Sequence, residues 1–195
     1  YQQRNAIRVI NTRHEGGASN MADAYAKLTG KPGICMVTRG PGATNASVGI
    51  HTAFQDSTPV ILFIGQVARD MVDREAFQEI DFRRMYSEMA KWVAQIDDPA
   101  RIPEYISRAF HVATSGRPGP VVLALPEDML SEMAVAYDVP AAVPVQAAPS
   151  ADNMEKFRNL LSEAKRPFIL LGGPTWNAEA VTDITAFAEA NSLTV

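Results

Sequence analysis

Two continuous apolar runs, at 34–38 and 59–65, dominate the pattern of hydrophobic and polar positions along the chain. Unbroken runs of this length are typical of strands in a parallel sheet that is covered on both faces. Shorter apolar runs at 7–10, 91–94 and 121–125 predict further strands. The pattern therefore predicts a sheet whose strands are buried on both sides.

The segments between these runs carry a helical period. Apolar residues recur at i, i+3, i+4 and i+7 from Met21 to Leu28, and Gly30 is placed to end this helix. A helix rich in small residues is expected over 43–54, and a helix with one apolar face over 102–114. The polar stretch 67–78 lacks a clean period and is expected to be mostly loop, and a helical turn is expected over 81–86.

Strands that alternate with helices predict an α/β fold: a three-layer, doubly wound, mostly parallel sheet, followed by the start of a second α/β domain. We expect the first domain over 1–138, with a strand and a helix missing before its start. A proline-containing linker is expected over 139–151, and the beginning of the second domain over 152–195. The elements expected there are a helix from Asp152, a strand over 167–171, a turn at 172–174 and a helix over 181–190.

Composition narrows the function classes. The 195 residues are 47% hydrophobic and 21% charged, with a net charge of −4 and no basic cluster, which argues against a nucleic-acid partner. No apolar run reaches the ~18 residues that a membrane span needs, and the first residues do not form a signal peptide. Cys35 is the only cysteine, so an internal disulfide and a cysteine-built metal site are excluded. We expect Cys35 to be a buried strand residue and the protein to be cytoplasmic.

Two corners between a strand and a helix carry candidate chemistry, because ligands bind at such corners in open α/β sheets. Glu15, at a helix start, is either an acid that complements the helix dipole or a carboxyl group that shares a proton with a ligand nitrogen. His14 is either a structural or solvated residue beside the helix start, or a catalytic residue. The turn at 40–42 is a Gly-x-Gly, but Asn45 stands where a dinucleotide site needs a third small residue, and no acid follows the next strand. A dinucleotide-binding oxidoreductase is therefore disfavoured.

Six motifs occur in one order along the chain. They are Arg13-His14-Glu15, Ala22-Asp23-Ala24-Tyr25-Ala26, Val37-Thr38-Arg39-Gly40-Pro41-Gly42-Ala43-Thr44-Asn45, Gly65-Gln66-Val67, Ala76-Phe77-Gln78-Glu79 and Gly116-Arg117-Pro118-Gly119-Pro120-Val121. This series resembles the N-terminal, pyrimidine-binding domain of thiamine-diphosphate enzymes, closest to the acetohydroxyacid (acetolactate) synthase group. The resemblance covers about residues 7–130.

The resemblance implies a catalytic role for Glu15, which matches the family's invariant glutamate. Its carboxyl group would hydrogen-bond the ring nitrogen N1′ of thiamine diphosphate and favour the imino tautomer, which takes the C2 proton and leaves the ylid. The ylid would attack a 2-keto acid, release carbon dioxide and pass the remainder to an acceptor, as in a decarboxylase or carboligase (a lyase or transferase). The resemblance also implies a homodimer or homotetramer with the cofactor between two subunits. We expect a dry pocket to raise the pKa of this carboxyl group.

The same matching implies further site residues. Those expected against the pyrimidine or the subunit interface are Gly40, Pro41, Gly42 and Asn45. Gln66 would contact the cofactor, and both Gln66 and Gln78 would face the reacting centre. Phe77 would line the substrate channel.

Magnesium and FAD are the other cofactors that the resemblance raises. Mg²⁺ and the diphosphate are held in this family by a C-terminal domain with a Gly-Asp-Gly…Asn pattern, which this sequence lacks, so no metal ligand is assigned here and the fragment alone is expected to be inactive. The arginine that marks the flavin site in acetohydroxyacid synthases falls at Tyr86 or Ser87, and Pro174 replaces a third glycine in the second domain. FAD therefore stays open.

Two readings of the chain remain. The first is the N-terminal fragment of a thiamine-diphosphate-dependent 2-keto acid decarboxylase or carboligase, which predicts a gene that continues past Val195 into the diphosphate motif. The second is a non-catalytic dimerisation or interaction module that keeps the family fold, which predicts a natural chain end near Val195.

Overall fold

A single parallel sheet forms the centre of the first part of the chain. The computed structural model describes residues 7–145, 147–173 and 176–195. The strands are β1 (Gly33–Val37), β2 (Val60–Gln66), β3 (Trp92–Gln95) and β4 (Val121–Pro126). They lie in the order β1-β2-β4-β3, and every pair is parallel. The carboxyl ends of all four strands therefore meet at one edge of the sheet.

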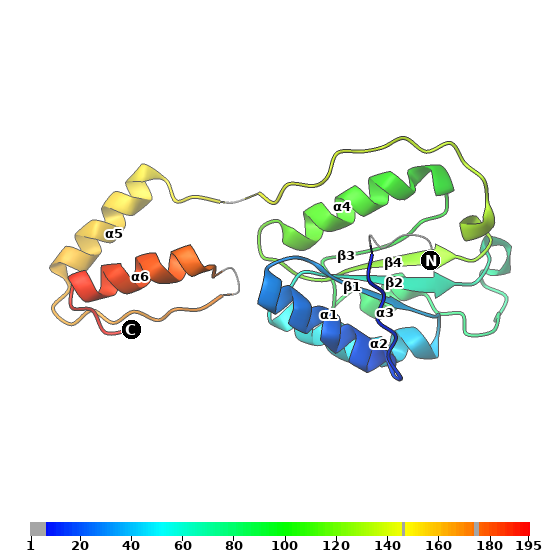
Figure 1. The fold of residues 1–195 in the computed structure, drawn as a ribbon, viewed down its shortest axis with the longest axis horizontal. Helices are drawn as coiled ribbons and strands as arrows, with labels where there is room; N and C mark the ends of the chain where they lie inside the picture. The colour runs from blue at the N-terminus through cyan, green and yellow to red at the C-terminus, as the bar shows by residue number, and fades with distance from the viewer. Residues whose placement is uncertain (1–6, 146, 174–175) are drawn as a thin grey trace.

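Helices cover both faces of this sheet (Figure 1). They are α1 (Glu15–Thr29), α2 (Pro41–Gln55), α3 (Phe82–Tyr86) and α4 (Ile102–Thr114), with short 3₁₀ turns at Arg69–Met71 (η1), Pro99–Arg101 (η2) and Met129–Ser131 (η3). Residues of α1, α2 and α3 pack against one face around Leu62, and residues of α4 pack against the other around Ile61. Because neighbouring residues of a strand point to opposite faces, the apolar run of β2 feeds both cores. The predicted three-layer α/β fold is confirmed.

Most strands expected from the sequence lie within two residues of the observed ones, but the strand expected over 7–10 is wrong. Residues 8–12 have no regular structure, and Ile7, Val9 and Ile10 are more than half exposed. A strand needs a hydrogen-bonded neighbour, and in the described part of the chain β1 pairs only with β2. Residues 8–10 pair with neither edge strand of the described sheet, β1 or β3, so the apolar run alone did not make a strand.

Close backbone approaches pack α1 against its neighbours. A Cβ atom added to Gly33 would lie 2.0 Å from the carbonyl oxygen of Ala22, and one added to Gly49 would lie 2.4 Å from the hydroxyl of Ser19. Only glycine leaves room for these contacts. At its end α1 stops at Gly30, which has a φ of +68° and whose N–H donates to the carbonyl of Ala26.

Cys35 is expected to resist alkylation in the native protein. Cys35 is a residue of β1 whose side chain lies in the core and is 4% exposed, as the sequence predicts. Burial raises the pKa of its thiol to about 11. Because only the thiolate reacts readily, iodoacetamide at about pH 8 should leave Cys35 unmodified in native protein and modify it fully in denaturant. Mass spectrometry of both samples checks this, and stoichiometric labelling of native protein would contradict the buried position.

A long segment without helix or strand leads from η3 to a second unit (Figure 1). That unit contains α5 (Ala151–Glu163) and α6 (Ala178–Ala190), and a single parallel bridge joins Phe168 to Thr194. The strand expected over 167–171 is thus reduced to this bridge, and Pro174, in the expected turn, lies outside the described residues. None of the helices that the structure describes is long and apolar enough to span a bilayer.

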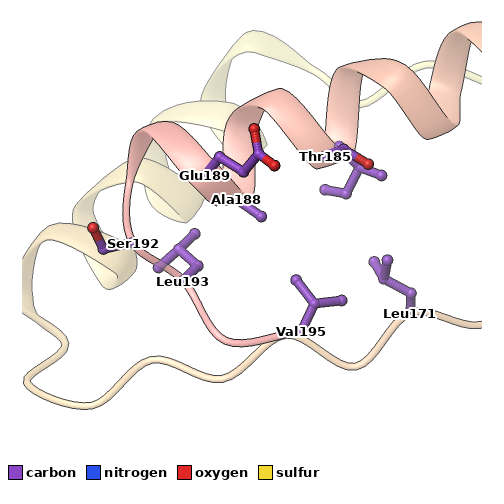
Figure 2. A pocket seen from close by; sticks show the side chains of 8 residues that line it. Leu171, Thr185, Ala188, Glu189, Ser192, Leu193 and Val195 are labelled. Atoms are coloured by element: carbon purple, nitrogen blue, oxygen red, sulfur yellow. The ribbon is translucent and has the colours of Figure 1, made fainter.

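The second unit exposes much of its apolar surface. A pocket of about 340 Å³ lies between α6 and the bridged segments, and Leu171, Leu193 and Val195 are among its lining residues (Figure 2). Leu160 is 71% exposed and Leu170 is 89% exposed. Apolar side chains in such numbers are ordinarily covered by further layers of structure.

Candidate active site at the carboxyl edge of the sheet

The sequence-predicted site residues gather at the edge where the strands end. Glu15 begins α1, the glycine turn at 40–42 follows β1 and Gln66 ends β2. Glu127, which the sequence did not assign to the site, follows β4 at the same edge. In open parallel sheets this edge is the usual place for ligands.

Glu15 and Asn45 lie together although they are 30 positions apart. The Asn45 amide nitrogen donates to Oε2 of Glu15 at 3.1 Å. The other carboxylate oxygen, Oε1, lies 3.6 Å from the place where Gly42 would carry a Cβ atom. The half-buried Glu15 side chain is therefore oriented through one oxygen, while the other faces a backbone without a side chain.

His14 has a structural role in this arrangement. It is the N-cap of α1, and its Nδ1 atom accepts a hydrogen bond of 3.0 Å from the N–H of Gly16. An N-cap acceptor satisfies one of the free N–H groups at a helix start. The structural reading of His14 is thus the one that the geometry favours.

The raised pKa of Glu15 was expected for a dry pocket, and the single chain leaves this side chain in contact with solvent. The pKa is lowered, first by the hydrogen bond from its own backbone N–H and then by the Asn45 amide, and these outweigh the opposing effect of burial. Hydrogen bonds that favour the charged form have this effect when the group stays in contact with solvent. In this chain Glu15 is therefore a carboxylate at neutral pH.

The glycine turn supports the loop that contains Phe77 and Gln78. Gly40 has a φ of +53°, and a Cβ atom added to it would lie 2.7 Å from the Cβ atom of Gln78. Gln78 itself has a φ of +65°. The structure thus brings Gly40 and Gln78 together, whereas Phe77 is 78% exposed and Pro41, the first residue of α2, also faces solvent.

Gln66 is buried, and both polar atoms of its side chain form hydrogen bonds within the chain. Its side chain is 5% exposed, its amide nitrogen donates to the carbonyl of Ile80 at 2.9 Å, and its amide oxygen accepts from the N–H of Val67 at 2.9 Å. These bonds anchor the end of the 73–81 loop to β2. The sequence prediction placed Gln66 at the reacting centre. In the structure its side-chain hydrogen bonds fix the loop after β2.

Tyr86, one of the two positions at which the flavin-marking arginine was expected, is fully buried. Its hydroxyl donates to the carbonyl oxygen of Ala43 at 2.5 Å, and burial raises the pKa of this phenol. Tyr86 therefore joins α3 to the first turn of α2, close behind the glycine turn.

Two arginines form ion pairs at this edge of the sheet that the sequence did not predict. Arg69 forms an ion pair of 2.6 Å with Asp128, contacts Glu132 and donates to the carbonyl of Asp97 at 2.6 Å. Arg39, which the sequence analysis names only as part of a motif, forms an ion pair with Glu127. Glu127 and Asp128, which come just after the last predicted strand, were the sequence signal for these ion pairs. Residues that follow parallel strands lie at the same edge of the sheet, within reach of the other loops there.

The described residues contain no group of three or more His, Cys, Asp or Glu side chains that could hold a metal ion. The loop that follows η1 does carry acids, but Glu79 uses both carboxylate oxygens to accept from the N–H groups of Asp73 and Ala76. These oxygens shape the loop.

Comparison with known proteins identifies relatives for the chain. Residues 1–85 match the model of a family described as thiamine pyrophosphate enzyme, N-terminal TPP binding domain. The acetolactate synthase large subunit of Corynebacterium glutamicum is 37% identical over 194 residues, which is 97% of this chain and 31% of that protein.

Two further relatives come from distant organisms. A probable acetolactate synthase large subunit of Methanocaldococcus jannaschii is 40% identical over 92% of this chain and 32% of its own length. A chloroplastic acetolactate synthase of Arabidopsis thaliana is 36% identical over 97% of this chain and 29% of its own length. The chain therefore spans about a third of the length of these relatives.

Proposed function

Because residues 1–85 belong to the N-terminal TPP-binding domain of the thiamine pyrophosphate enzymes, we propose that this chain is the N-terminal part of a thiamine-diphosphate-dependent 2-keto acid decarboxylase or carboligase of the acetolactate synthase type. The family resemblance predicted from the motifs is confirmed. The observation that carries the proposal is the carboxyl group of Glu15, oriented by Asn45 at the carboxyl edge of the sheet.

The residues at this edge fit the aminopyrimidine of thiamine diphosphate. When bound, the cofactor supplies a carbon nucleophile and an electron sink for decarboxylation. Glu15 would exchange a proton with a ring nitrogen through Oε1, while Asn45 holds Oε2 in place. A Cβ atom added to Gly42 would lie 3.6 Å from Oε1 and 2.8 Å from the Thr38 methyl group, so only glycine fits at this place beside the carboxylate. Gly40 and Pro41 would shape the backbone on which the ring rests.

Glu15 needs a covering surface to hold a proton at neutral pH. Its pKa is lowered in the single chain, and removal of solvent would push the pKa in the opposite direction. We propose that a second subunit provides this cover and that the protein is a homodimer or homotetramer. Met21, Tyr25 and Leu28 on α1 are about half exposed or more, and an apolar surface of this kind suits such an interface.

The substrate side and the remaining cofactors form part of the same proposal. Phe77 and Gln78 would contact a small-molecule 2-keto acid, and Gln66 would act through its bond to Ile80. Mg²⁺ would be bound by a segment outside residues 1–195. We propose the domain limits 1–138 and 152–195 with a linker over 139–151, and a cytoplasmic location, although some relatives are named chloroplastic or mitochondrial.

The non-catalytic module is the alternative, and the exposed apolar residues of α1 and β1 favour it as well, because they would serve a dimer without chemistry. It differs from the first reading in what it predicts for the cofactor. A packing module has no need for thiamine diphosphate to bind beside Glu15.

An assay of the full-length protein separates the two readings. We expect calorimetric binding of thiamine diphosphate in the presence of Mg²⁺, and cofactor-dependent release of carbon dioxide from at least one member of a panel of 2-keto acids. Parallel reactions with FAD test the flavin, and we expect no FAD dependence because neither Tyr86 nor Ser87 is the marker arginine. A protein that forms oligomers but neither binds the cofactor nor releases carbon dioxide would support the alternative module.

A further inference from the structure

Arg39 links three loops at the carboxyl edge of the sheet. It follows β1, its Nε donates to the carbonyl of Phe77 at 3.3 Å, and its Nη1 donates to Oε2 of Glu127 at 2.9 Å. Phe77 lies in the loop after β2, and Glu127 follows β4. One guanidinium group thus connects the ends of three neighbouring strands.

The contact made by Arg39 holds the loop where it rests on the glycine turn. The next residue, Gly40, is in contact with Gln78, as the 2.7 Å approach of an added Cβ atom shows. Gln78 keeps a φ of +65°, a conformation that costs free energy for a residue with a side chain and needs support from its surroundings. Arg39 gives that support one residue away, at the Phe77 carbonyl.

The other anchors of the loop lie on either side of Phe77. Gln66 binds the carbonyl of Ile80, and Glu79 binds the N–H groups of Asp73 and Ala76. The Phe77 side chain itself is 78% exposed and does not fix the loop by burial. The Phe77–Gln78 pair lies inside a turn that the N–H of Glu79 closes by donating to the carbonyl of Ala76 at 3.0 Å, and Arg39 ties this turn to the ends of β1 and β4.

We propose that Arg39 is a positioning residue that sets the place of Phe77 and Gln78, and through them the fit of the 2-keto acid. The assignment to substrate rests on the proposed function, whereas the ordering of the loop does not. A guanidinium group carries its N–H donors on three nitrogens in a fixed plane, so Nε and Nη1 of Arg39 reach acceptors on two different loops, whereas the ammonium group of lysine presents all its donors from one nitrogen. The Arg39 side chain is 24% exposed and that of Glu127 is 58% exposed, so the pair adds little to overall stability and its loss should leave the protein folded.

Arg39→Gln, Arg39→Lys and Glu127→Gln in the full-length protein test the proposal. In Arg39→Gln we expect the amides of residues 76–80 to exchange hydrogen about tenfold faster, with the amides of β2 unchanged. The KM for the 2-keto acid should rise about tenfold while proton exchange at C2 of bound thiamine diphosphate keeps its rate. Arg39→Lys should restore part of both effects, and Glu127→Gln should add nothing when combined with Arg39→Gln. Arg101→Gln, which breaks an exposed ion pair with Glu104 on α4, is the matched control and should change neither reading.

Three results would overturn the proposal. Loop amides that exchange at the wild-type rate in Arg39→Gln would show that Arg39 does not hold the loop. A loosened loop with an unchanged KM would show that its place does not matter to the substrate. A fall in C2 exchange would show that Arg39 acts on the cofactor. Failure of the proposed function appears separately, as an absence of cofactor binding in the wild-type protein.

Discussion

Glu15→Ala in the full-length enzyme is expected to abolish proton exchange at C2 of bound thiamine diphosphate and to lower kcat by about 10³-fold, within the range that a positioned acid or base contributes. The physical reason is that Glu15 presents the carboxyl oxygen that exchanges a proton with the ring, and Asn45 cannot replace it because an amide is not an acid at neutral pH. Deuterium incorporation at C2, followed by quenching and NMR, measures the effect.

Two controls separate a loss of catalysis from a loss of folding in this variant. Glu15 is the first residue of α1, and its side chain contacts solvent, so the variant should keep its Tm within a few degrees. Glu104→Gln removes an equivalent acid from the first turn of α4 and should leave exchange unchanged. A Glu15→Ala enzyme that exchanges C2 at the wild-type rate would exclude the catalytic role.

The fold was predictable where the hydrophobic pattern is local. The runs that became β1 and β2 are continuous, a pattern typical of strands covered on both faces. β2 is covered in this way, whereas Ile34 and Met36 of β1 are 48% and 61% exposed, so the expectation of burial on both faces is wrong for β1. The run at 7–10 looks equally strand-like, but pairing depends on a neighbour elsewhere in the chain, which residue type does not encode. For the same reason the run at 167–171 predicts a strand, yet the structure contains only the bridge from Phe168 to Thr194.

The site was predictable only in part. Glu15 and Asn45 could be assigned to one site through the motif resemblance, and the structure brings them together across 30 positions. The pairing of Arg39 with Glu127 spans 88 positions and belongs to no motif, so spacing could not reveal it. The lowered pKa of Glu15 escaped prediction because it depends on solvent around the carboxylate and on the hydrogen bonds that reach it.

Gly33→Ala is expected to have the largest effect on stability of any single-methyl change at a described glycine, with a loss of about 3 kcal/mol, the upper end of what overpacking usually costs. The added Cβ atom would lie 2.0 Å from the carbonyl oxygen and 2.6 Å from the carbonyl carbon of Ala22. Both are backbone atoms inside α1, so no side chain can turn aside to relieve the clash. Native-state hydrogen exchange of the β1 and β2 amides in the full-length protein measures the loss.

Gly17→Ala is the matched control, because it adds the same methyl group to open space. Gly17 lies in α1, and no heavy atom beyond its own chain neighbours and helix backbone lies within 4 Å of its added Cβ. There the lower conformational entropy of alanine in the unfolded chain should stabilise the protein by about 0.5 kcal/mol. The entropic gain is common to both variants, and the clash at Gly33 reverses the sign there. The close packing of α1 on β1 also places Glu15, at the start of the helix, within reach of Asn45 on α2. If Gly33→Ala were tolerated as easily as Gly17→Ala, α1 would have to lie farther from β1 than described, and the placement of Glu15 would be lost with it.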